Sequence, residues 1–309
     1  MKTFEIDSIQ PLLSDIIEFK RFMGRYYLSN ITIKEDSIGQ KCWVLTLSDG
    51  TGDFNVYCNS QELMSIELKA HSIVHVEAAL LQTHGSAYFK CKNLLECNHS
   101  HKLGEDLSNL PRSQCPLPKY FDALIVLVSR VQNPYLRSFI RSVLLQKSVG
   151  VRYLQCPASL NYHHNYPGGL LRHSVEIAWD ILGVGDLNSH EKDIAVVAAL
   201  LHDIGKTLTL TSSMRRTEIG KLVDHSQLTL EVCSNELKKL ESLAPNVANH
   251  LRHAWTCYSP KARYGFKPKT QVAKYLQKVD RMNAENDYGE GFIPQFSNVT
   301  EVLRETVGG

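Results

Sequence analysis

His202 and Asp203 stand side by side in the stretch AALLHDIGK, residues 198–206. The apolar residues before the pair predict a helix that ends there, and Gly205 is suited to terminate it. Imidazole and carboxylate are both good ligands for a divalent cation, and a helix terminus leaves room for a substrate beside that cation. A His-Asp pair alone is weak evidence because such pairs occur by chance, but this chain supplies further candidate ligands.

Three predicted helices bring these candidates within reach of one another. His173 falls within residues 169–182, the His-Asp pair ends residues 193–205, and Asp280 falls within residues 270–284. If these helices pack together, two imidazoles and two carboxylates converge from distant parts of the chain, as in metal sites inside helical bundles. The expected cofactor is one or two divalent ions, Mn, Fe, Ni or Mg, held by His173, His202, Asp203 and Asp280.

Other polar residues near this set could act on a phosphate. Lys206 follows the His-Asp pair at a position suited to a phosphate oxygen. His163 and His164 precede a Pro-Gly-Gly run at 167–169, where glycine lets the backbone approach a substrate closely. One of the two could orient a phosphate or protonate a leaving group, and we assign this catalytic role to His164. The alternative is a loop that only leads into the next helix.

A basic segment follows the predicted helix at 245–255. Between residues 201 and 283 there are fourteen Lys and Arg against seven Asp and Glu, which favours polyanionic substrates. Aromatic and cationic residues alternate in this segment, as in channels where bases stack on rings while phosphates pair with cations. The candidate nucleic-acid contacts are Lys261, Arg263, Tyr264, Lys267 and Lys269, near Tyr258 and Phe266. The alternative is an exposed basic loop without a specific function.

The sequence of the first third of the chain predicts β-structure. Aromatic and β-branched residues predict five strands, and QELMSIELKA at 61–70 is a short helix candidate between the third and fourth. This order suggests an OB-type barrel, a common platform for single-stranded nucleic acid, although any small barrel used for packing would give a similar pattern. The predicted strands are residues 26–34, 41–47, 54–58, 72–81 and 87–95, with a turn at 48–53.

The predicted organisation is two domains of different class joined by a linker. Residues 98–118 lose periodicity and gather Pro, Ser, Asn and Gly, so His99 and His101 there are read as solvated linker histidines. We expect an OB-like nucleic-acid-binding domain at 1–97, a linker at 98–118 and an all-α helical bundle at 119–309. Further helices are predicted at 119–132, 134–147, 224–243 and 245–255, with Asn133 as an N-cap and Pro134 as a first helical residue.

Composition narrows the cellular setting. The 309 residues carry a formal net charge of +2, and no apolar run is long enough to span a bilayer. The first residues, MKTFEIDSIQ, resemble neither a signal peptide nor a transit peptide. The eight cysteines include no C-x-x-C pair, which is typical of reduced thiols. We therefore expect a cytoplasmic protein that has no membrane partner, and its oligomeric state is not predicted.

The order His…His-Asp…Asp, with HDIGK at its centre, resembles the HD-domain metal-dependent phosphohydrolase superfamily. CPASLNYHHNYPGGLLRHSVEIA at 156–178 carries the lead-in H-H-x-x-x-G-G-L-x-x-H of two HD groups. The YhaM-type 3′–5′ exoribonucleases join an OB-fold to an HD domain, and that resemblance covers nearly the whole chain. The second group is the HD domain of TraI-like mobile-element proteins, which is especially similar in the residues PAS…HH…PGGLLRHS. That resemblance covers the HD domain only.

The resemblance implies further roles and exposes one departure. GKLVDHSQLT at 220–229 matches the exoribonuclease histidine after the HD motif, so His225 becomes a candidate catalytic residue together with Asp203. YhaM-like proteins carry a His-His pair where this chain has Tyr258 and Ser259, which leaves a second ion open. His225 and His253, and less favourably His250, are the remaining candidate donors for that ion.

The favoured function is metal-dependent hydrolysis of a phosphodiester in single-stranded nucleic acid. The resemblance, and not the spacing, implies RNA as substrate and attack from the 3′ end. Three alternatives stay open: a DNA-processing nuclease of a mobile element, a nucleotide or cyclic-nucleotide phosphohydrolase, and a non-catalytic nucleic-acid-binding protein with a degenerate site. RNA and DNA are both candidate partners.

Overall fold

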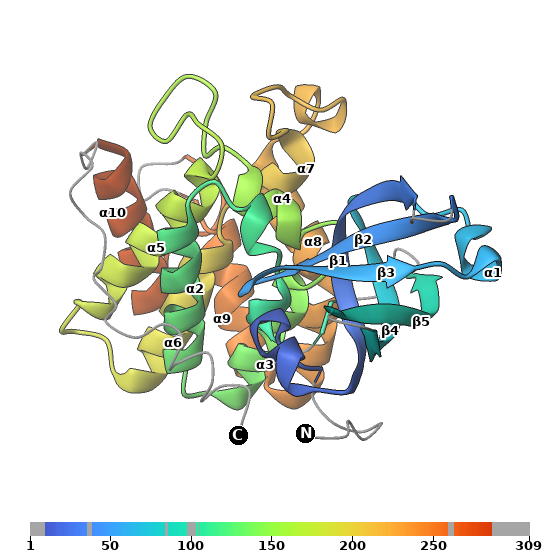
Figure 1. The fold of residues 1–309 in the computed structure, drawn as a ribbon. Helices are drawn as coiled ribbons and strands as arrows, with labels where there is room; N and C mark the ends of the chain where they lie inside the picture. Colours follow the sequence, from blue (N-terminus) through green and yellow to red (C-terminus); the bar gives the residue numbers. More distant parts are fainter. Residues whose placement is uncertain are drawn as a thin grey trace. The chain divides into compact units, whose positions relative to one another are not determined.

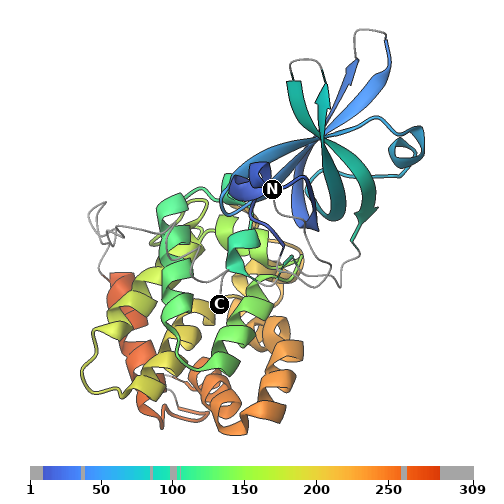
Figure 2. The same cartoon turned by 60° about the horizontal axis from the view of Figure 1, so that its bottom comes forward.

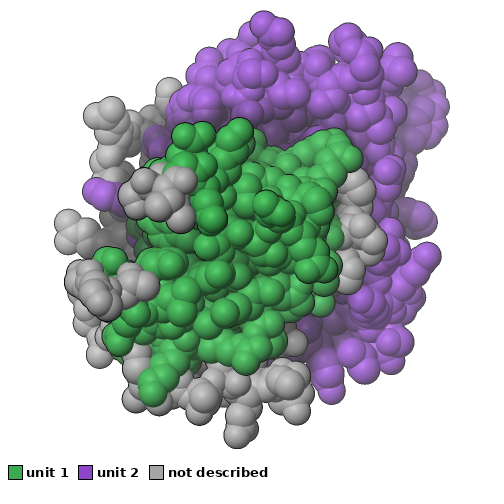
Figure 3. Space-filling model, turned by 45° about the vertical axis from the view of Figure 1, so that its right-hand side comes forward, with its two compact units in different colours: residues 1–114, 145–148 green, residues 115–144, 149–309 purple. Residues whose placement is uncertain are grey.

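The structure, a computed structural model, contains two compact units. They are Met1–Gln114 with Leu145–Ser148, and Cys115–Leu144 with Val149–Gly309 (Figure 3). Each unit is treated by itself below. The described residues are 10–35, 39–83, 86–97, 103–104, 106–258 and 263–285.

The first unit is a closed five-stranded barrel with the strand order β1-β2-β3-β5-β4. β1 pairs antiparallel with both β2 and β4, and β3 meets β5 in parallel, so the sheet formed by the described residues closes without a free edge. Figure 2 shows the strands of this unit in a second view. The predicted OB-like barrel is confirmed. The strands are β1 (Arg21–Glu35), β2 (Lys41–Asp49), β3 (Gly52–Cys58), β4 (Ser72–Thr83) and β5 (Ser86–Glu96).

The barrel interior is filled by alternate residues of each strand, as the two-residue period of a strand requires. Phe22, Phe54 and Phe89 meet there edge to face, with ring centroids 5.3 to 6.5 Å apart. Between β3 and β4 lies α1 (Gln61–Met64), where the sequence predicted a longer helix at 61–70. Ser60 caps α1 by accepting a hydrogen bond from the Leu63 N–H at 3.4 Å.

Asp49 secures the turn between β2 and β3 to the segment that precedes the barrel. Its buried carboxylate accepts hydrogen bonds from the N–H groups of Leu13 at 2.7 Å, Thr51 at 2.8 Å and Gly52 at 3.3 Å. Burial outweighs these hydrogen bonds and raises the pKa of Asp49 to about 6.

The second unit is helical, as predicted (Figure 1). Asn133 caps α3 by accepting from the N–H groups of Tyr135 and Leu136, and Pro134 is its first residue. The short helices α4 and α7 were not predicted, since one or two turns carry no readable periodicity. The helices are α2 (Pro118–Arg130), α3 (Pro134–Leu144), α4 (Gly150–Gln155), α5 (Gly169–Leu182), α6 (Ser189–Leu201), α7 (Lys206–Thr209), α8 (His225–Leu243), α9 (Pro245–Thr256) and α10 (Gln271–Glu285).

Two of these helices form the centre of the unit. α6 begins at a capping box, in which the Asn188 side chain accepts from the Glu191 N–H at 3.0 Å and Glu191 reaches back to the Asn188 N–H. Every residue of α6 from Asp193 to Leu201 is buried, and α5 buries ten of its residues. Within the described part of the chain, no helix combines the length and apolar character needed to cross a membrane.

The raised pKa of Asp49 predicts a pH dependence of barrel stability. The native state keeps a proton that the unfolded chain, with a pKa near 4, has already released, so stability falls as pH rises from about 4 through 6. A rise in the pKa of Asp49 from near 4 to about 6 corresponds to about 3 kcal/mol of stability. Asp49→Asn is neutral throughout and should lack this loss. Hydrogen exchange of β2 amides at pH 4.5 and 7.5 measures it.

The matched control is Asp53→Asn, on an exposed position of β3. Its stability difference from the wild type should stay the same at both pH values. A difference between wild type and Asp49→Asn that does not change with pH would contradict the buried-charge explanation.

Candidate metal centre

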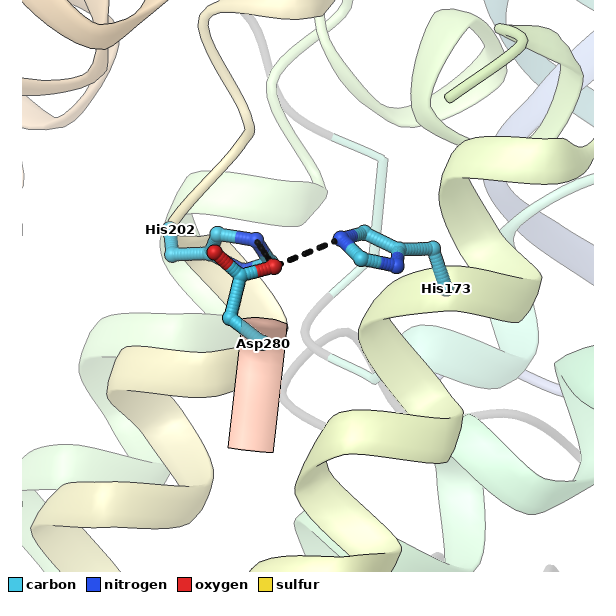
Figure 4. Close-up of side chains that lie close together, drawn as sticks. All are labelled: His173, His202 and Asp280. Atoms are coloured by element: carbon cyan, nitrogen blue, oxygen red, sulfur yellow. Dashed lines mark ion pairs between the residues drawn. The ribbon is translucent and has the colours of Figure 1, made fainter. Parts of the chain in front are cut away.

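Three helices place two histidines and an aspartate around one point. His173 lies on α5, His202 directly follows α6, and Asp280 lies on α10. Their potential ligand atoms all lie within 4.8 Å of one another. Asp280 Oδ1 is 3.2 Å from His173 Nε2 and 3.6 Å from His202 Nε2, and Figure 4 shows the three side chains pointing toward a common centre.

Asp203 adds a second carboxylate to the cluster. Its Oδ2 lies 3.4 Å from His202 Nε2 and 3.7 Å from His173 Nε2. The side chain is buried, whereas the Asp280 side chain is 43% exposed and gives the cluster its open side. The structure thus brings together the four residues that the sequence proposed as ligands.

Hydrogen bonds on the far side of each ring fix which nitrogen faces the centre. His202 Nδ1 is 2.7 Å from the carbonyl oxygen of Ala199, which can only accept, so Nδ1 carries the proton. His173 Nδ1 is likewise 2.8 Å from Asn283 Oδ1. When the two rings are neutral, both Nε2 lone pairs therefore point at the cluster, and the buried His202 Nε2 has no hydrogen-bond partner among the described residues. This donor set fits a divalent transition metal.

Sequence reasoning missed the residues that hold His173 in place. Asn283 Nδ2 donates to Glu176 Oε2 at 3.2 Å, which orients the amide so that its oxygen faces His173. Glu176 in turn accepts from Tyr120 at 2.9 Å and from Arg172 at 2.7 Å. Spacing could have revealed them, since Asn283 follows Asp280 and Glu176 follows His173 by three residues on the same helix face.

The charges of the cluster stabilise one another. Burial opposes a charge on His202, but the carboxylates of Asp203 and Asp280 raise its pKa to about 10. Burial also opposes a charge on Asp203, but His202 and Lys206 hold the pKa of that carboxyl well below its usual value. A proton on His202 and a metal ion would compete for the same nitrogen, so metal binding releases a proton.

Lys206 and His225 contact Asp203 from two further elements. Lys206, the first residue of α7, pairs with Oδ2, and Nε2 of His225, the first residue of α8, lies 3.2 Å from Oδ1. Gly205 permits this arrangement, because a Cβ there would lie 2.0 Å from the carbonyl oxygen of His225. Lys206 and His225, two of the predicted catalytic residues, therefore border the candidate metal centre.

The neighbouring histidines 163 and 164 have different surroundings. His164 is buried, with Nδ1 3.0 Å from the Tyr166 hydroxyl and Nε2 3.2 Å from Glu176 Oε2. His163 is only half-buried, and its ring centroid is 5.1 Å from that of His173. Burial and the nearby His173 lower the pKa of His163 to about 4, so its ring is neutral near pH 7. His163 is therefore the less enclosed of the two rings, and the catalytic role expected of His164 stays a prediction.

The two histidines of α9 were candidates for a second ion. His253 Nε2 accepts a hydrogen bond from the Lys269 N–H at 2.9 Å. Burial, together with the nearby Lys269 and His250, lowers the pKa of His253. Among the described residues, neither His253 nor His250 belongs to the group of side chains that could hold a metal ion. His253 instead attaches the segment 263–269 to α9, while His225 remains beside Asp203.

In the described part of the basic segment, residues 263–269, cationic side chains lie over exposed aromatic rings. Tyr264 is 72% and Phe266 73% exposed. The Arg263 guanidinium lies 5.2 Å from the Tyr264 ring centroid, and Lys269 Nζ lies 5.3 Å from that of Phe266. Lys267 is half-buried. The predicted contact Lys261 and the departure at Ser259 lie outside the described residues.

The fold of this segment depends on its contacts with Tyr258. The Tyr258 N–H donates to the Phe266 carbonyl at 2.8 Å. Gly265, at φ +85°, has no room for a side chain, because a Cβ would lie 2.0 Å from the Tyr258 ring. Tyr258, at the position where the resemblance would place a histidine, thus supports the segment.

Comparisons with known proteins agree with this geometry. Residues 170–285 match the family model of the HD domain. The 3′-5′ exoribonuclease YhaM of Bacillus licheniformis is 23% identical over 257 residues, which is 81% of this chain and 80% of the relative. The YhaM of Bacillus subtilis (strain 168) is 23% identical over 255 residues, again 81% and 80%.

One similar solved structure is the second OB-fold domain of replication protein A from Methanococcus maripaludis. The match covers 32% of this chain and 98% of the chain in that structure. Its identity is 17% and its TM-score 0.21, so the description of the barrel depends on the strand order given above.

The hydrogen bond from His173 to Asn283 predicts an effect on metal affinity. Asn283→Leu removes the acceptor that fixes the His173 tautomer, and loss of such a partner typically weakens metal binding by about 10- to 100-fold. Titration of chelator-treated protein with Mn²⁺ or Ni²⁺ by calorimetry measures the change. Asn246→Leu, at an exposed position of α9, is the control and should bind as the wild type does. Equal affinities for all three proteins would refute a role for Asn283.

Proposed function

We propose that the protein is an HD-type metal-dependent phosphodiesterase that hydrolyses single-stranded nucleic acid. The observation that carries this proposal is the convergence of the lone pairs of His173 and His202 with the carboxylates of Asp203 and Asp280. The HD-domain match over 170–285 covers all four of these residues and supports a metal-dependent hydrolase.

These four residues would hold one divalent ion, with Mn, Fe or Ni favoured over Mg by the imidazole ligands. When bound, such an ion polarises a phosphoryl oxygen and acidifies a water molecule. Asp280, which is partly exposed, lies on the side from which a phosphate can enter. His225, beside Asp203 Oδ1, is the candidate donor for a second ion.

The protein's own side chains supply the remaining chemistry. Lys206 is buried against Asp203, and its ammonium group is placed to stabilise charge on a phosphate oxygen. His163, with a neutral ring near pH 7, can hydrogen-bond a phosphate or the leaving oxygen. His164 is engaged by Tyr166 and Glu176, and we assign it to holding Glu176 in position.

The substrate class is proposed from the basic segment and from the relatives. Exposed rings beneath Arg263 and Lys269 combine stacking surfaces with phosphate partners, which suits an unpaired strand. The relatives that match along four-fifths of the chain are named 3′-5′ exoribonucleases, which supports RNA and attack from the 3′ end. Hydrolysis of labelled RNA and DNA strands, each blocked at the 3′ or the 5′ end, tests both the substrate and the direction of attack. Nucleotides and cyclic nucleotides are tested as the alternative substrates.

Asp203→Ala should abolish hydrolysis. The variant loses a candidate metal ligand that is also the partner of Lys206 and His225. Loss of a group that only hydrogen-bonds to a ligand typically costs up to roughly 100-fold, so activity on bis-p-nitrophenyl phosphate should fall by more than that. The control is Glu231→Ala, an exposed carboxylate of α8, which should retain full activity. Substantial activity in Asp203→Ala would mean that another site does the chemistry.

Substitutions in the basic segment should affect strands more than small diesters. Tyr264→Ala should weaken single-strand affinity by roughly 1–3 kcal/mol with little change in salt dependence, because stacking is not ionic. Lys267→Ala with Lys269→Ala should instead reduce the slope of log affinity against log salt by roughly 0.7 per lost phosphate contact. Fluorescence anisotropy at several salt concentrations separates the two effects.

Hydrolysis of bis-p-nitrophenyl phosphate is the control for these segment variants, since a small diester needs only the metal centre. We expect it to be unchanged. If the small diester suffers as much as the strand, the segment belongs to the fold or to the catalytic pocket, and its assignment as a strand contact is wrong.

A further inference from the structure

A second concentration of positive charge lies in the helical unit, around the end of α7. Between Asp203 and Glu218 the chain carries three basic residues and no acidic one. Arg152 adds a fourth cation from α4, which lies beside α7 (Figure 1), and its Nη1 donates to the Thr207 carbonyl oxygen at 3.1 Å. Positive charge that few carboxylates offset attracts anions. This region is therefore a candidate anion site in addition to the metal centre.

A pocket of about 220 Å³ lies between α4 and the residues that follow α7. It is lined by Arg152, Gln155, Cys156, Leu210, Thr211 and Ser212. No carboxylate is among the described residues that line it, and Arg152 pairs with no carboxylate in the described part of the chain. The pocket therefore contains a guanidinium whose charge the described residues do not neutralise.

The contact with Thr207 prepares the Arg152 guanidinium for a ligand. A guanidinium has five N–H groups, and the Thr207 carbonyl oxygen accepts from only one of its nitrogens. Because this hydrogen bond holds the group beside α7, less side-chain freedom is lost when the remaining N–H groups meet an oxyanion. Their planar arrangement matches two oxygens of a phosphate or a carboxylate. Arg152 is thus placed to bind an anion that the chain itself does not supply.

Ser212 supplies two further donors in the same pocket. It lies in a turn in which the Met214 N–H donates to the Thr211 carbonyl at 3.1 Å and the Thr211 hydroxyl accepts from the Arg215 N–H at 3.2 Å. These bonds hold the turn without using Ser212, whose N–H and hydroxyl have no partner among the described residues. Hydroxyl groups and backbone N–H groups are common partners of nucleic-acid phosphates.

Cys156 connects the pocket to the metal centre. Its Sγ lies 3.4 Å from the carbonyl oxygen of Lys206, whose ammonium group pairs with Asp203. Burial raises the pKa of the thiol to about 12, and the charged groups that act on it are Lys206, Arg152 and Asp203. The pocket therefore lies close to the centre, along α7, a helix of four residues that rises only about 6 Å. A strand covers such a distance within a few nucleotides.

We propose that this pocket binds a phosphate group of a nucleotide through the Arg152 guanidinium and the N–H and hydroxyl of Ser212. The phosphate belongs either to the bound strand, a few nucleotides from the scissile diester, or to a free nucleotide. A phosphate has enough oxygens to accept from both residues at once, whereas the guanidinium fork alone engages both oxygens of a carboxylate. The identity of the ligand as a nucleotide rests on the proposed function.

The test measures binding without hydrolysis, on chelator-treated protein. Phosphorus-31 NMR follows the titration of inorganic phosphate, and fluorescence anisotropy follows a labelled single strand. Arg152→Gln keeps a donor for the Thr207 carbonyl but loses the charge and the fork. It should weaken phosphate binding roughly 10- to 150-fold, the range for a hydrogen bond to a charged group. If a strand phosphate occupies the pocket, the slope of log strand affinity against log salt should also fall by roughly 0.7.

A second variant closes the pocket from the other side. Ser212→Glu places a carboxylate near Arg152 and should block phosphate binding at least as strongly as Arg152→Gln does. Ser242→Glu adds the same charge at an exposed position of α8 and controls for charge alone. Arg137→Gln is the matched control for the arginine, because Arg137 also donates to a backbone carbonyl, that of Val131, and does not line the pocket. Both controls should bind as the wild type does.

The two probes distinguish the sources of the phosphate. Loss of phosphate binding with an unchanged strand slope assigns the pocket to a free nucleotide, and loss of both assigns it to the strand. Unchanged binding of both probes in Arg152→Gln and Ser212→Glu would overturn the proposal, as would equal losses in the two controls. If Arg152→Gln does not fold, Ser212→Glu, on an exposed turn, still decides.

Failure of the proposed function has a different outcome. In that case wild-type protein loaded with Mn²⁺ does not hydrolyse bis-p-nitrophenyl phosphate, whereas the titration of inorganic phosphate still reports on the pocket.

Discussion

The buried carboxylate of Asp203 is the constraint that shapes the helical unit. An unpaired carboxylate in such a position would cost several kcal/mol, so positive or polarisable partners must surround it. Lys206 and His225 contact it from α7 and α8, and the rings of His173 and His202 lie within 3.7 Å. The negative charge of the Asp203 and Asp280 carboxylates, which these partners offset, also makes the cluster suitable for binding a cation.

A second buried carboxylate, that of Glu176, organises the next layer outward. It accepts hydrogen bonds from Tyr120, Arg172 and Asn283, and His164 lies 3.2 Å away. The carboxylates of Asp203 and Asp280 face the candidate metal centre, whereas Glu176 accepts from the Asn283 amide whose oxygen faces His173. The division explains why two adjacent histidines, 163 and 164, differ in burial and in their partners.

Much of this arrangement could be predicted from the sequence, and the exceptions have physical reasons. The residues predicted for α5 match its observed bounds because glycines flank a strongly patterned segment. The proposed ligands converge because three patterned helices carry them. Asn283 and Glu176 were missed because their three-residue spacing from Asp280 and His173 indicates a shared helix face but does not show whether that face is buried. His253 was a candidate ligand because an imidazole that accepts from a backbone N–H cannot be distinguished in sequence from one that binds a metal.

The position of Asp280 and Asn283 on one helix links the centre to the docking of that helix. α10 packs through Val272, Ala273, Leu276 and Val279, and it alone supplies both the carboxylate and the amide. Undocking of α10 would remove both groups while His202 and Asp203 stayed in place, and an ion bound to all of them would oppose that undocking. Thermodynamic linkage makes this effect reciprocal, so ion affinity and the local stability of α10 must rise and fall together.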